Sequence, residues 1–433
     1  MKKYKVCKYI LNSLYLAPDE IRACCQRFHY EGEMRGDAVL IKNQTKSIKE
    51  LKSADIKKAR INLLNKIQND EEKACKGCRY IDEVDNKPEI NADTNFVSIE
   101  HHSFCNLRCN YCSDLFYGGK KPSYNVVGLL NELGKEGHIK NCKQVVWGGG
   151  EPTLEKQFEN LVVDINKAAS PKIYHRVFTN SVRYSAAIDK FLKQNLIKIV
   201  TSIDAGTRDT YKIVRGKDKF IDVFENLKKY ALSGQNKITI KYIITEENNS
   251  IKEFNNFSEK CKKEGLINCN FQISLNYKFD KLSINNYKTI LIFLSILQKN
   301  GINKTFIDDH ILARLKSLDN SEIEEIRSYL IKNNANVLIS HKDHSSVILY
   351  GAGQIAKEII NKTKFFKHIK NFDIIDSNKV DEIFLGKKIK HPNILKKDNR
   401  GVFITSAQSY DDILSQIKKI RGEKTNILNG VFI

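Results

Sequence analysis

Three cysteines stand close together in the stretch HHSFCNLRCNYC: Cys105, Cys109 and Cys112. Thiolates are soft, anionic ligands that suit iron–sulfur clusters as well as zinc. A structural zinc site closes its coordination sphere with four protein ligands. Three thiolates without a fourth cysteine beside them therefore predict a metal centre with one open position. A zinc site completed by His101 or His102 is the alternative.

A second group of cysteines lies before residue 80: Cys7, Cys24, Cys25, Cys75 and Cys78. The chain shows no signal peptide, and cysteines in a cytoplasmic protein favour metal or redox chemistry over disulfides. One residue of the Cys24–Cys25 doublet together with the other three gives a closed set of four ligands. The remaining cysteines, Cys142, Cys261 and Cys269, are scattered and fit small buried hydrophobic residues.

The elements that would position the triad alternate between strand-like and helix-like patterns. Runs rich in β-branched and aromatic residues predict six strands, at 96–102, 144–150, 172–180, 197–204, 237–245 and 267–276. Amphipathic stretches between them predict helices. Six β-then-α units in series predict an α/β fold with a parallel sheet, either open or curled into a partial (β/α)6 barrel. Ligands gather at the carboxyl ends of such strands, and the triad directly follows the first strand.

The 433 residues are too many for one small core, so we expect several domains. The patterns predict an N-terminal cysteine-bearing region, an α/β domain, a helical connector and a second α/β domain. The expected boundaries are 1–95, 96–280, 281–335 and 336–433.

The spacing in CNLRCNYC, Cys-x3-Cys-x-aromatic-Cys, resembles the motif of the radical S-adenosylmethionine (SAM) superfamily. The resemblance covers residues 96 to about 280. In that family three thiolates hold three irons of a 4Fe–4S cluster, and the fourth iron binds the amine and carboxylate of SAM. The resemblance implies that Cys105, Cys109 and Cys112 are the catalytic cluster ligands and that Tyr111 lies near the cofactor.

Further motifs extend this resemblance to the expected SAM contacts. The stretch WGGGEP resembles the family's glycine-rich motif that contacts the SAM amine, which implies Gly149, Gly150, Glu151 and Pro152. Glycines at such a place let the backbone approach a ligand closely.

Two later strand ends and one helical run also resemble the family. FTNS and TSIDAG are similar to its third- and fourth-strand motifs, which implies Asn180, Ser202 and Asp204 as cofactor contacts. The run TYKIVRGKDKF implies Arg215 as a partner of the SAM carboxylate, because a guanidinium binds a carboxylate through two parallel hydrogen bonds. An ordinary surface ion pair is the alternative for Asp204 and for Arg215.

The N-terminal cysteines resemble the SPASM or twitch extensions of radical SAM enzymes, which bind an auxiliary 4Fe–4S cluster. The resemblance implies such a cluster at Cys7, Cys24 or Cys25, Cys75 and Cys78. Two features depart from the pattern. The block precedes the expected barrel instead of following it, and Glu20 stands where the family usually has glycine. Structural zinc and unliganded cysteines are the alternatives.

The last part of the chain shows a nucleotide-binding pattern. Gly351 and Gly353 follow the strand-like run VILY, and a second strand-like run ends at Asp376. Glycines allow the tight turn, a helix N-terminus binds phosphate, and the acid binds a ribose. The segment resembles small Rossmann-like modules attached to sugar-modifying and methyltransferase-type enzymes. It predicts either a nucleotide site or a module that serves assembly.

Composition narrows the range of partners. The net charge is +21, yet lysine greatly outnumbers arginine and is spread along the chain. Nucleic-acid readers instead cluster arginine and aromatic residues, so a nucleic-acid partner is not favoured. No apolar run approaches the roughly 20 residues that span a bilayer, so we expect a cytoplasmic protein without a membrane partner.

Together the sequence predicts an oxygen-sensitive radical SAM enzyme. Such an enzyme cleaves SAM reductively to a 5′-deoxyadenosyl radical, which takes hydrogen from a substrate. We expect a small-molecule substrate, with a sugar or nucleotide sugar as the first candidate, and a one-electron reductant such as flavodoxin or ferredoxin. A peptide- or protein-modifying radical SAM enzyme is the first alternative, and a non-catalytic iron–sulfur or zinc protein is the second. Strand alternation makes Glu100, His102 and Lys241 candidates for facing the substrate.

Overall fold

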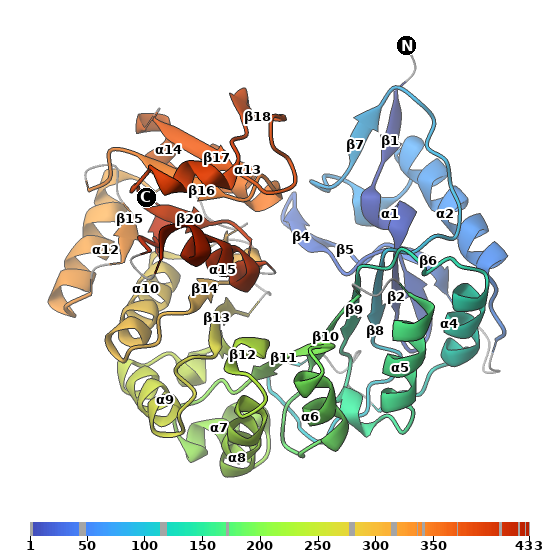
Figure 1. The fold of residues 1–433 in the computed structure, drawn as a ribbon, viewed down its shortest axis with the longest axis horizontal. Coiled ribbons are helices and arrows are strands. Elements are labelled where there is room, and N and C mark those ends of the chain that lie inside the picture. Colours follow the sequence, from blue (N-terminus) through green and yellow to red (C-terminus); the bar gives the residue numbers. More distant parts are fainter. Residues whose placement is uncertain are drawn as a thin grey trace. The chain divides into compact units, whose positions relative to one another are not determined.

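The structure is a computed structural model, shown in Figure 1. It describes residues 3–42, 49–112, 119–169, 173–276, 282–312, 318–335, 337–339, 343–369, 371–406, 409–422, 425–428 and 430–432. The chain divides into two compact units. Unit 1 comprises Met1–Thr201 and Arg215–Ile238, and unit 2 comprises Ser202–Val214 and Thr239–Ile433.

The sheet strands of unit 1 lie in the order β11 (Ile197–Ser202), β10 (Tyr174–Phe178), β9 (Gln144–Trp147), β8 (Phe96–Ile99), β2 (Ser13–Leu16), β3 (Glu20–Arg22) and β6 (Val39–Lys42). From β11 to β2 every neighbouring pair is parallel. The pairs β2–β3 and β3–β6 are antiparallel. The N-terminal region therefore extends the parallel sheet through β2, beside the strand that precedes the cysteine triad.

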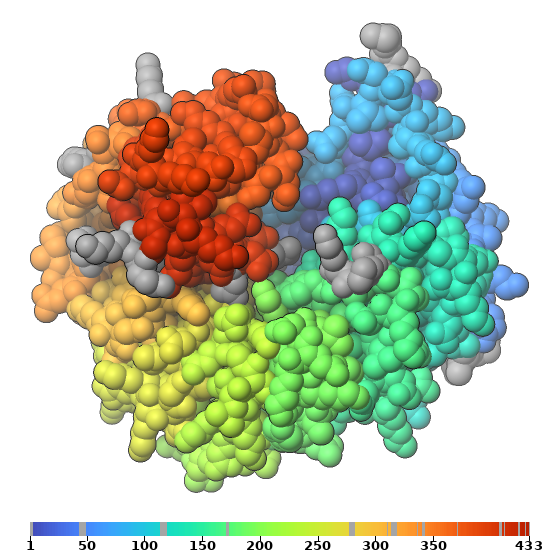
Figure 2. All heavy atoms as spheres, in the orientation of Figure 1, coloured from blue at the N-terminus to red at the C-terminus, as the bar shows by residue number. Residues whose placement is uncertain are grey.

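The larger helices of unit 1 are α2 (Ser53–Gln68), α4 (Val126–Lys135), α5 (Phe158–Ala168), α6 (Ala186–Lys193) and α8 (Phe220–Ala231). Each buries one apolar stripe, as Leu129, Leu130 and Leu133 of α4 illustrate. Asn125 and Ser185 cap α4 and α6 by accepting hydrogen bonds from backbone N–H groups of the first turn. In Figure 2 the residues of α4, α5 and α6 form an outer face of unit 1.

Smaller elements complete the N-terminal region: β1 (Tyr4–Val6), α1 (Lys8–Asn12), β4 (Arg27–Tyr30), β5 (Glu33–Gly36), η1 (Lys73–Cys75) and β7 (Asp82–Val84). β1 pairs with β7, and β4 pairs with β5, both antiparallel. The short helix η2 (Pro152–Leu154) follows β9.

Unit 2 begins with three parallel strands, β12 (Ile238–Ile244), β13 (Asn270–Leu275) and β14 (Thr305–Ile307). Its first helices are α7 (Arg208–Arg215), α9 (Ile251–Lys263), α10 (Ile284–Lys299), α11 (Asp309–Leu312) and α12 (Asn320–Lys332). The Tyr242 ring of β12 packs against Phe254 and Phe257 of α9 and Phe293 of α10. Because strand residues alternate, Lys241 faces the opposite side of the sheet.

The C-terminal module of unit 2 has a small parallel sheet in the order β17 (Phe372–Ile375), β16 (Val347–Tyr350), β20 (Val402–Ile404). Its helices include α13 (Gln354–Lys362), α14 (Phe365–His368), η5 (Pro392–Lys396) and α15 (Tyr410–Arg421). Two further pairs are β15 (Leu338–Ile339) with β21 (Val431–Phe432) and β18 (Ile383–Phe384) with β19 (Lys387–Lys388). β16, the first of these strands along the chain, lies between the other two. The glycine-rich turn that follows it therefore stands at the point where the strand order reverses.

The predicted fold class is confirmed as a mixed α/β fold with a large parallel sheet. A strand forms within each of the six predicted runs, and only the start of the run 172–180 lies outside the described residues. The described parts of the chain contain no closed barrel. They also contain no helix long and apolar enough to cross a membrane.

Candidate functional site

The cysteine loop, which we define as residues 100–112, follows β8 directly. Its three thiols, those of Cys105, Cys109 and Cys112, are half-buried. The Cys112 N–H donates to the Cys109 carbonyl at 3.1 Å. Burial raises the pKa of the Cys105 thiol, and a hydrogen bond with the Cys109 thiol, followed by burial, raises that of Cys112. These thiols therefore stay protonated until a metal displaces their protons.

Arg215 and Gly216 contact the cysteine loop. The buried Arg215 guanidinium donates to the Tyr111 hydroxyl and lies 5.8 Å from the centre of its ring. The Arg108 N–H donates to the Arg215 carbonyl at 3.1 Å. A Cβ atom on Gly216, where φ is +74°, would overlap the Arg108 carbonyl oxygen. These contacts place the positive charge of Arg215 near the thiols. That charge opposes the rise in the pKa of Cys105 and of Cys112.

The glycine-rich segment after β9 packs on the cysteine loop. The Gly150 N–H donates to the His102 carbonyl at 3.1 Å, and the Glu151 N–H donates to the Phe104 carbonyl at 2.7 Å. A Cβ atom on Gly149 would come within 2.7 Å of the His102 oxygen, and one on Gly150 would overlap the Phe104 carbonyl. Glycine is therefore required here for backbone packing within the protein itself.

The Glu151 carboxylate connects the ends of β9 and β10. It is 2% exposed and accepts hydrogen bonds from the Thr179 hydroxyl at 2.8 Å and the Asn180 N–H at 2.7 Å. The Thr153 hydroxyl and N–H also donate to it, just after Pro152 opens η2. Burial raises the pKa of Glu151, and these hydrogen bonds oppose that shift. Its role in the structure is to fix the loops around the triad.

Asn180 links the third predicted strand to the first cysteine. Its Nδ2 donates to Asn106 Oδ1 at 2.6 Å and lies 3.7 Å from the Cys105 sulfur. Sequence reasoning missed Asn106, although it is a polar residue directly beside Cys105. The Asn180–Asn106 pair orients the amide toward the thiol.

Ser202 and Asp204 belong to unit 2. Ser202 ends β11 and is half-buried. Asp204 is fully buried with φ of +61°, and its carboxylate accepts a hydrogen bond from the Ile243 N–H at 2.7 Å. Asn248 donates to the Asp204 carbonyl at 2.8 Å. Asp204 thus ties the end of β11 to the backbone of β12.

The cysteine pocket is the name we give to a pocket in unit 1 whose lining includes Cys7, Cys24, Cys75 and Cys78. Tyr9, Tyr80 and Phe28 also line it. The Cys78 N–H donates to the Cys75 carbonyl at 3.1 Å, a turn that draws these two together. Burial raises the pKa of all four thiols.

Of the Cys24–Cys25 doublet, Cys24 lines this pocket and Cys25 does not. The Cys25 side chain is exposed, although desolvation by the surrounding protein and the nearby Glu100 carboxylate raise its pKa to about 12. Glu100 accepts a hydrogen bond from the Tyr15 hydroxyl at 2.6 Å. The two cysteines therefore face different surroundings.

Ligand atoms also gather beside the thiols. Within the described ranges, three ligand atoms of different side chains lie within 4.8 Å of one another at His101, His102 and Glu155. In the cysteine loop, the Cys109 and Cys112 thiols lie within hydrogen-bonding reach of each other.

The remaining predicted residues lie in unit 2. Gly351 has φ of +111°, and a Cβ there would come within 2.6 Å of the Thr405 hydroxyl. Gly353 is the N-cap of α13. The Asp376 carboxylate accepts a hydrogen bond from the Ala352 N–H at 2.9 Å, inside the glycine-rich turn. Asp376 therefore already has a partner at the place where a ribose was expected.

The central part of the chain is similar to a known protein family. Residues 99–257 match the family model described as the radical SAM superfamily. A GTP 3′,8-cyclase of Pasteurella multocida is 28% identical over 183 residues, which are 41% of this chain and 53% of that protein. An uncharacterized protein of Methanocaldococcus jannaschii is 28% identical over 255 residues, which are 57% of this chain and 82% of that protein. The chain spans about half the length of the GTP 3′,8-cyclases it matches.

Solved structures show partial likeness. The anSMEcpe enzyme with bound AdoMet and a Cp18Cys peptide has a TM-score of 0.39 and 20% identity, over 50% of this chain and 64% of that one. Streptococcus suis SuiB bound to the precursor peptide SuiA has a TM-score of 0.36 and 15% identity, over 65% of this chain and 61% of that one.

Proposed function

We propose that this chain, whose residues 99–257 form a radical SAM domain, is an enzyme that cleaves SAM reductively and takes hydrogen from a small-molecule substrate. One observation carries the proposal beyond the family match. Arg215 and Asn180 come from two separate segments, and both contact the cysteine loop, at Tyr111 and at Cys105. The sequence predicted each of them separately as a cofactor contact.

The residues present fit a 4Fe–4S cluster at the cysteine loop. Three thiols share the loop, and the raised pKa of Cys105 and of Cys112 means that these two thiols lose their protons when a metal binds. Cys105, Cys109 and Cys112 would hold the cluster, which would pass one electron from an external reductant to SAM and so allow cleavage of its S–C5′ bond.

The protein's own residues would orient and shield this chemistry. Asn180 holds an amide beside the Cys105 sulfur, where it tunes the ligand. The Arg215 guanidinium is buried beside Tyr111, so it presents a fixed positive charge that suits the SAM carboxylate. Gly149 and Gly150 allow the glycine-rich segment to pack directly against the backbone of the cysteine loop.

For the substrate we propose a nucleotide or nucleotide sugar, within the wider class of sugars. Several relatives are named GTP 3′,8-cyclase, a name that states a nucleotide substrate. A peptide- or protein-modifying enzyme is the second candidate, because the cysteine pocket resembles the SPASM extensions that are common in that group.

An auxiliary 4Fe–4S cluster is proposed for the cysteine pocket, with Cys7, Cys24, Cys75 and Cys78 as ligands. All four thiols line one pocket, and four thiolates form a closed ligand set for an iron–sulfur cluster. At the C-terminal module, a nucleotide at Gly351 and Gly353 would lie beside the Asp376–Ala352 hydrogen bond, which already holds the glycine-rich turn. A role in assembly remains the alternative there.

The test is SAM cleavage in anaerobically reconstituted protein reduced with dithionite. We expect formation of 5′-deoxyadenosine and methionine without added substrate. Cys109→Ala should abolish it, whereas Cys142→Ala should retain it, because Cys142 is a buried residue outside both cysteine groups. No product from fully loaded protein that binds SAM, even after addition of lysate from the source organism, would refute the enzyme.

A further inference from the structure

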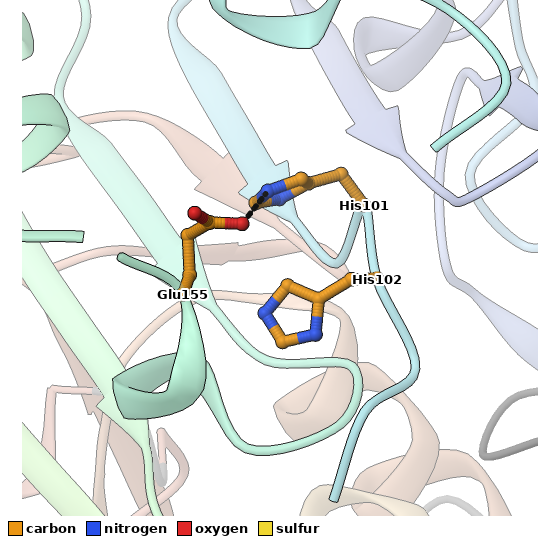
Figure 3. Close-up of side chains that lie close together, drawn as sticks. All are labelled: His101, His102 and Glu155. Atoms are coloured by element: carbon orange, nitrogen blue, oxygen red, sulfur yellow. Dashed lines mark hydrogen bonds and ion pairs between the residues drawn. The ribbon is translucent and has the colours of Figure 1, made fainter. Parts of the chain in front are cut away.

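Two histidines at the start of the cysteine loop lie close to a glutamate from a second chain segment. His101 and His102 follow β8, and Glu155 follows η2. Their ligand atoms lie within 4.8 Å of one another. Figure 3 shows the two rings and the carboxylate converging from two chain segments on one space.

The two imidazoles are poorly satisfied as ordinary core residues. His101 is 5% exposed and His102 is 3% exposed. The Nδ1 atoms of both rings are buried without a hydrogen-bond partner. The one hydrogen bond of the group joins His101 Nε2 to Glu155 Oε2 at 3.3 Å, which is long. His101 therefore faces Glu155 through Nε2, and its ring nitrogen without a partner is the opposite one, Nδ1.

Glu155 is oriented for a ligand by its own backbone. Its Oε1 accepts a hydrogen bond from the Gln157 N–H at 3.1 Å, which leaves Oε2 facing the two rings. The Gln157 N–H and His101 hold the pKa of Glu155 below its usual range, against the effect of burial. The geometry thus leaves Oε2 of Glu155 directed at His101.

We propose that His101, His102 and Glu155 bind one divalent transition-metal ion, separate from both cysteine groups. Two imidazoles and one carboxylate suit Zn²⁺ or Fe²⁺, and three protein ligands leave positions open for water or a substrate oxygen. A Zn²⁺ ion bound there carries a net charge of +1, which favours an anionic group such as a phosphate or carboxylate.

The test measures zinc in the full, tag-free chain after reconstitution of its iron–sulfur sites, so that thiols do not compete. After addition of Zn²⁺ and desalting, elemental analysis should find about one zinc per chain beside the iron. His102→Gln and Glu155→Gln should each lower that zinc at least tenfold at equal iron content. His138→Gln is the matched control, since His138 also pairs with carboxylates, Asp93 and Glu136, but is more exposed.

Iron content and circular dichroism report whether a variant has folded. Should His102→Gln lose iron as well, Glu155→Gln decides, because an amide keeps the shape of the carboxylate and can still bond with His101. Zinc at the same level in Glu155→Gln as in the unmutated chain would overturn the proposal. So would the absence of any bound zinc, which would reduce the group to a His101–Glu155 hydrogen bond.

Discussion

The cysteine loop and the cysteine pocket both collect thiols, but their surroundings differ. Polar groups surround the loop: the Arg215 guanidinium, the Tyr111 hydroxyl and the Asn180 amide. Apolar residues surround the pocket. Cys7 belongs to a buried cluster with Ile10, Leu63, Leu64 and Ile67, against which Cys24 and Cys75 also pack.

This difference indicates that the cysteine loop and the cysteine pocket have different functions. Three thiols beside a cation and an amide leave room for a charged cofactor to approach. Four thiols in an apolar pocket leave no protein-free ligand position, and low polarity favours a stable site that holds its metal. The loop is therefore the expected site of chemistry, and the pocket an expected site of structure or electron transfer.

The largest expected effect is the loss of iron when the cysteines of one site are replaced. The reconstituted chain should hold about eight irons, and replacement of Cys105, Cys109 and Cys112 together by Ala should leave about four and no SAM cleavage. Replacement of Cys75 and Cys78 by Ala should also leave about four irons but retain SAM binding. Iron and zinc analysis checks both variants. Four irons and one zinc in the unmutated chain would disprove the auxiliary cluster while sparing the loop.

Local pattern was enough to predict the strands that carry both regions. Runs such as QVVW and ITIKYII are rich in β-branched residues, and they form β9 and β12. The pairing of β2 with β8 joins residues more than 80 positions apart, and periodicity contains no signal for such a partner. That pairing places the N-terminal cysteines in the same unit as the triad.

The surroundings of individual side chains could not be predicted from the sequence either. The choice between Cys24 and Cys25 depends on which way the chain turns after β3, a matter of tertiary packing. Glu155 gave no signal, because a lone acid after a turn usually faces solvent. Asp204 was expected to contact the cofactor, which stays a prediction, and the hydrogen bond that its carboxylate accepts from β12 could not be read from the sequence.

The next effect tests whether the glycine segment serves the loop through packing. Gly150→Ala should lower the free energy of unfolding by roughly 1–3 kcal/mol and weaken SAM binding, because its Cβ overlaps the Phe104 carbonyl. Gly32→Ala is the control, since φ is +78° there but the space is open. It should cost about 1–2 kcal/mol through backbone strain and leave SAM binding unchanged. Denaturant unfolding and SAM titration measure the two quantities. Equal SAM affinity in both variants would contradict the packing role.

A smaller effect concerns the cation that distinguishes the loop from the pocket. Arg215→Ala should weaken SAM binding by about 10- to 150-fold, since a charge-assisted contact contributes roughly 1.5–3 kcal/mol. Both clusters should still assemble, because no cysteine is removed. Arg183→Ala, at an exposed arginine of the same unit, is the control. Calorimetry on the reconstituted protein measures the affinity. An unchanged affinity in Arg215→Ala would leave Arg215 with the sole role of packing on Tyr111.

The smallest effect on function is expected at Cys25, the neighbour that the pocket excludes. Cys25→Ala should change neither iron content nor SAM cleavage, whereas Cys24→Ala should lose the auxiliary iron.

Alkylation of the two thiols tests the same difference between Cys24 and Cys25. Cys25 is exposed, whereas Cys24 lines the pocket, so iodoacetamide should reach Cys25 more readily than Cys24. Mass spectrometry of reconstituted protein should find the label on Cys25 and not on Cys24. Label on Cys24 and protection of Cys25 would reverse the ligand assignment of the doublet.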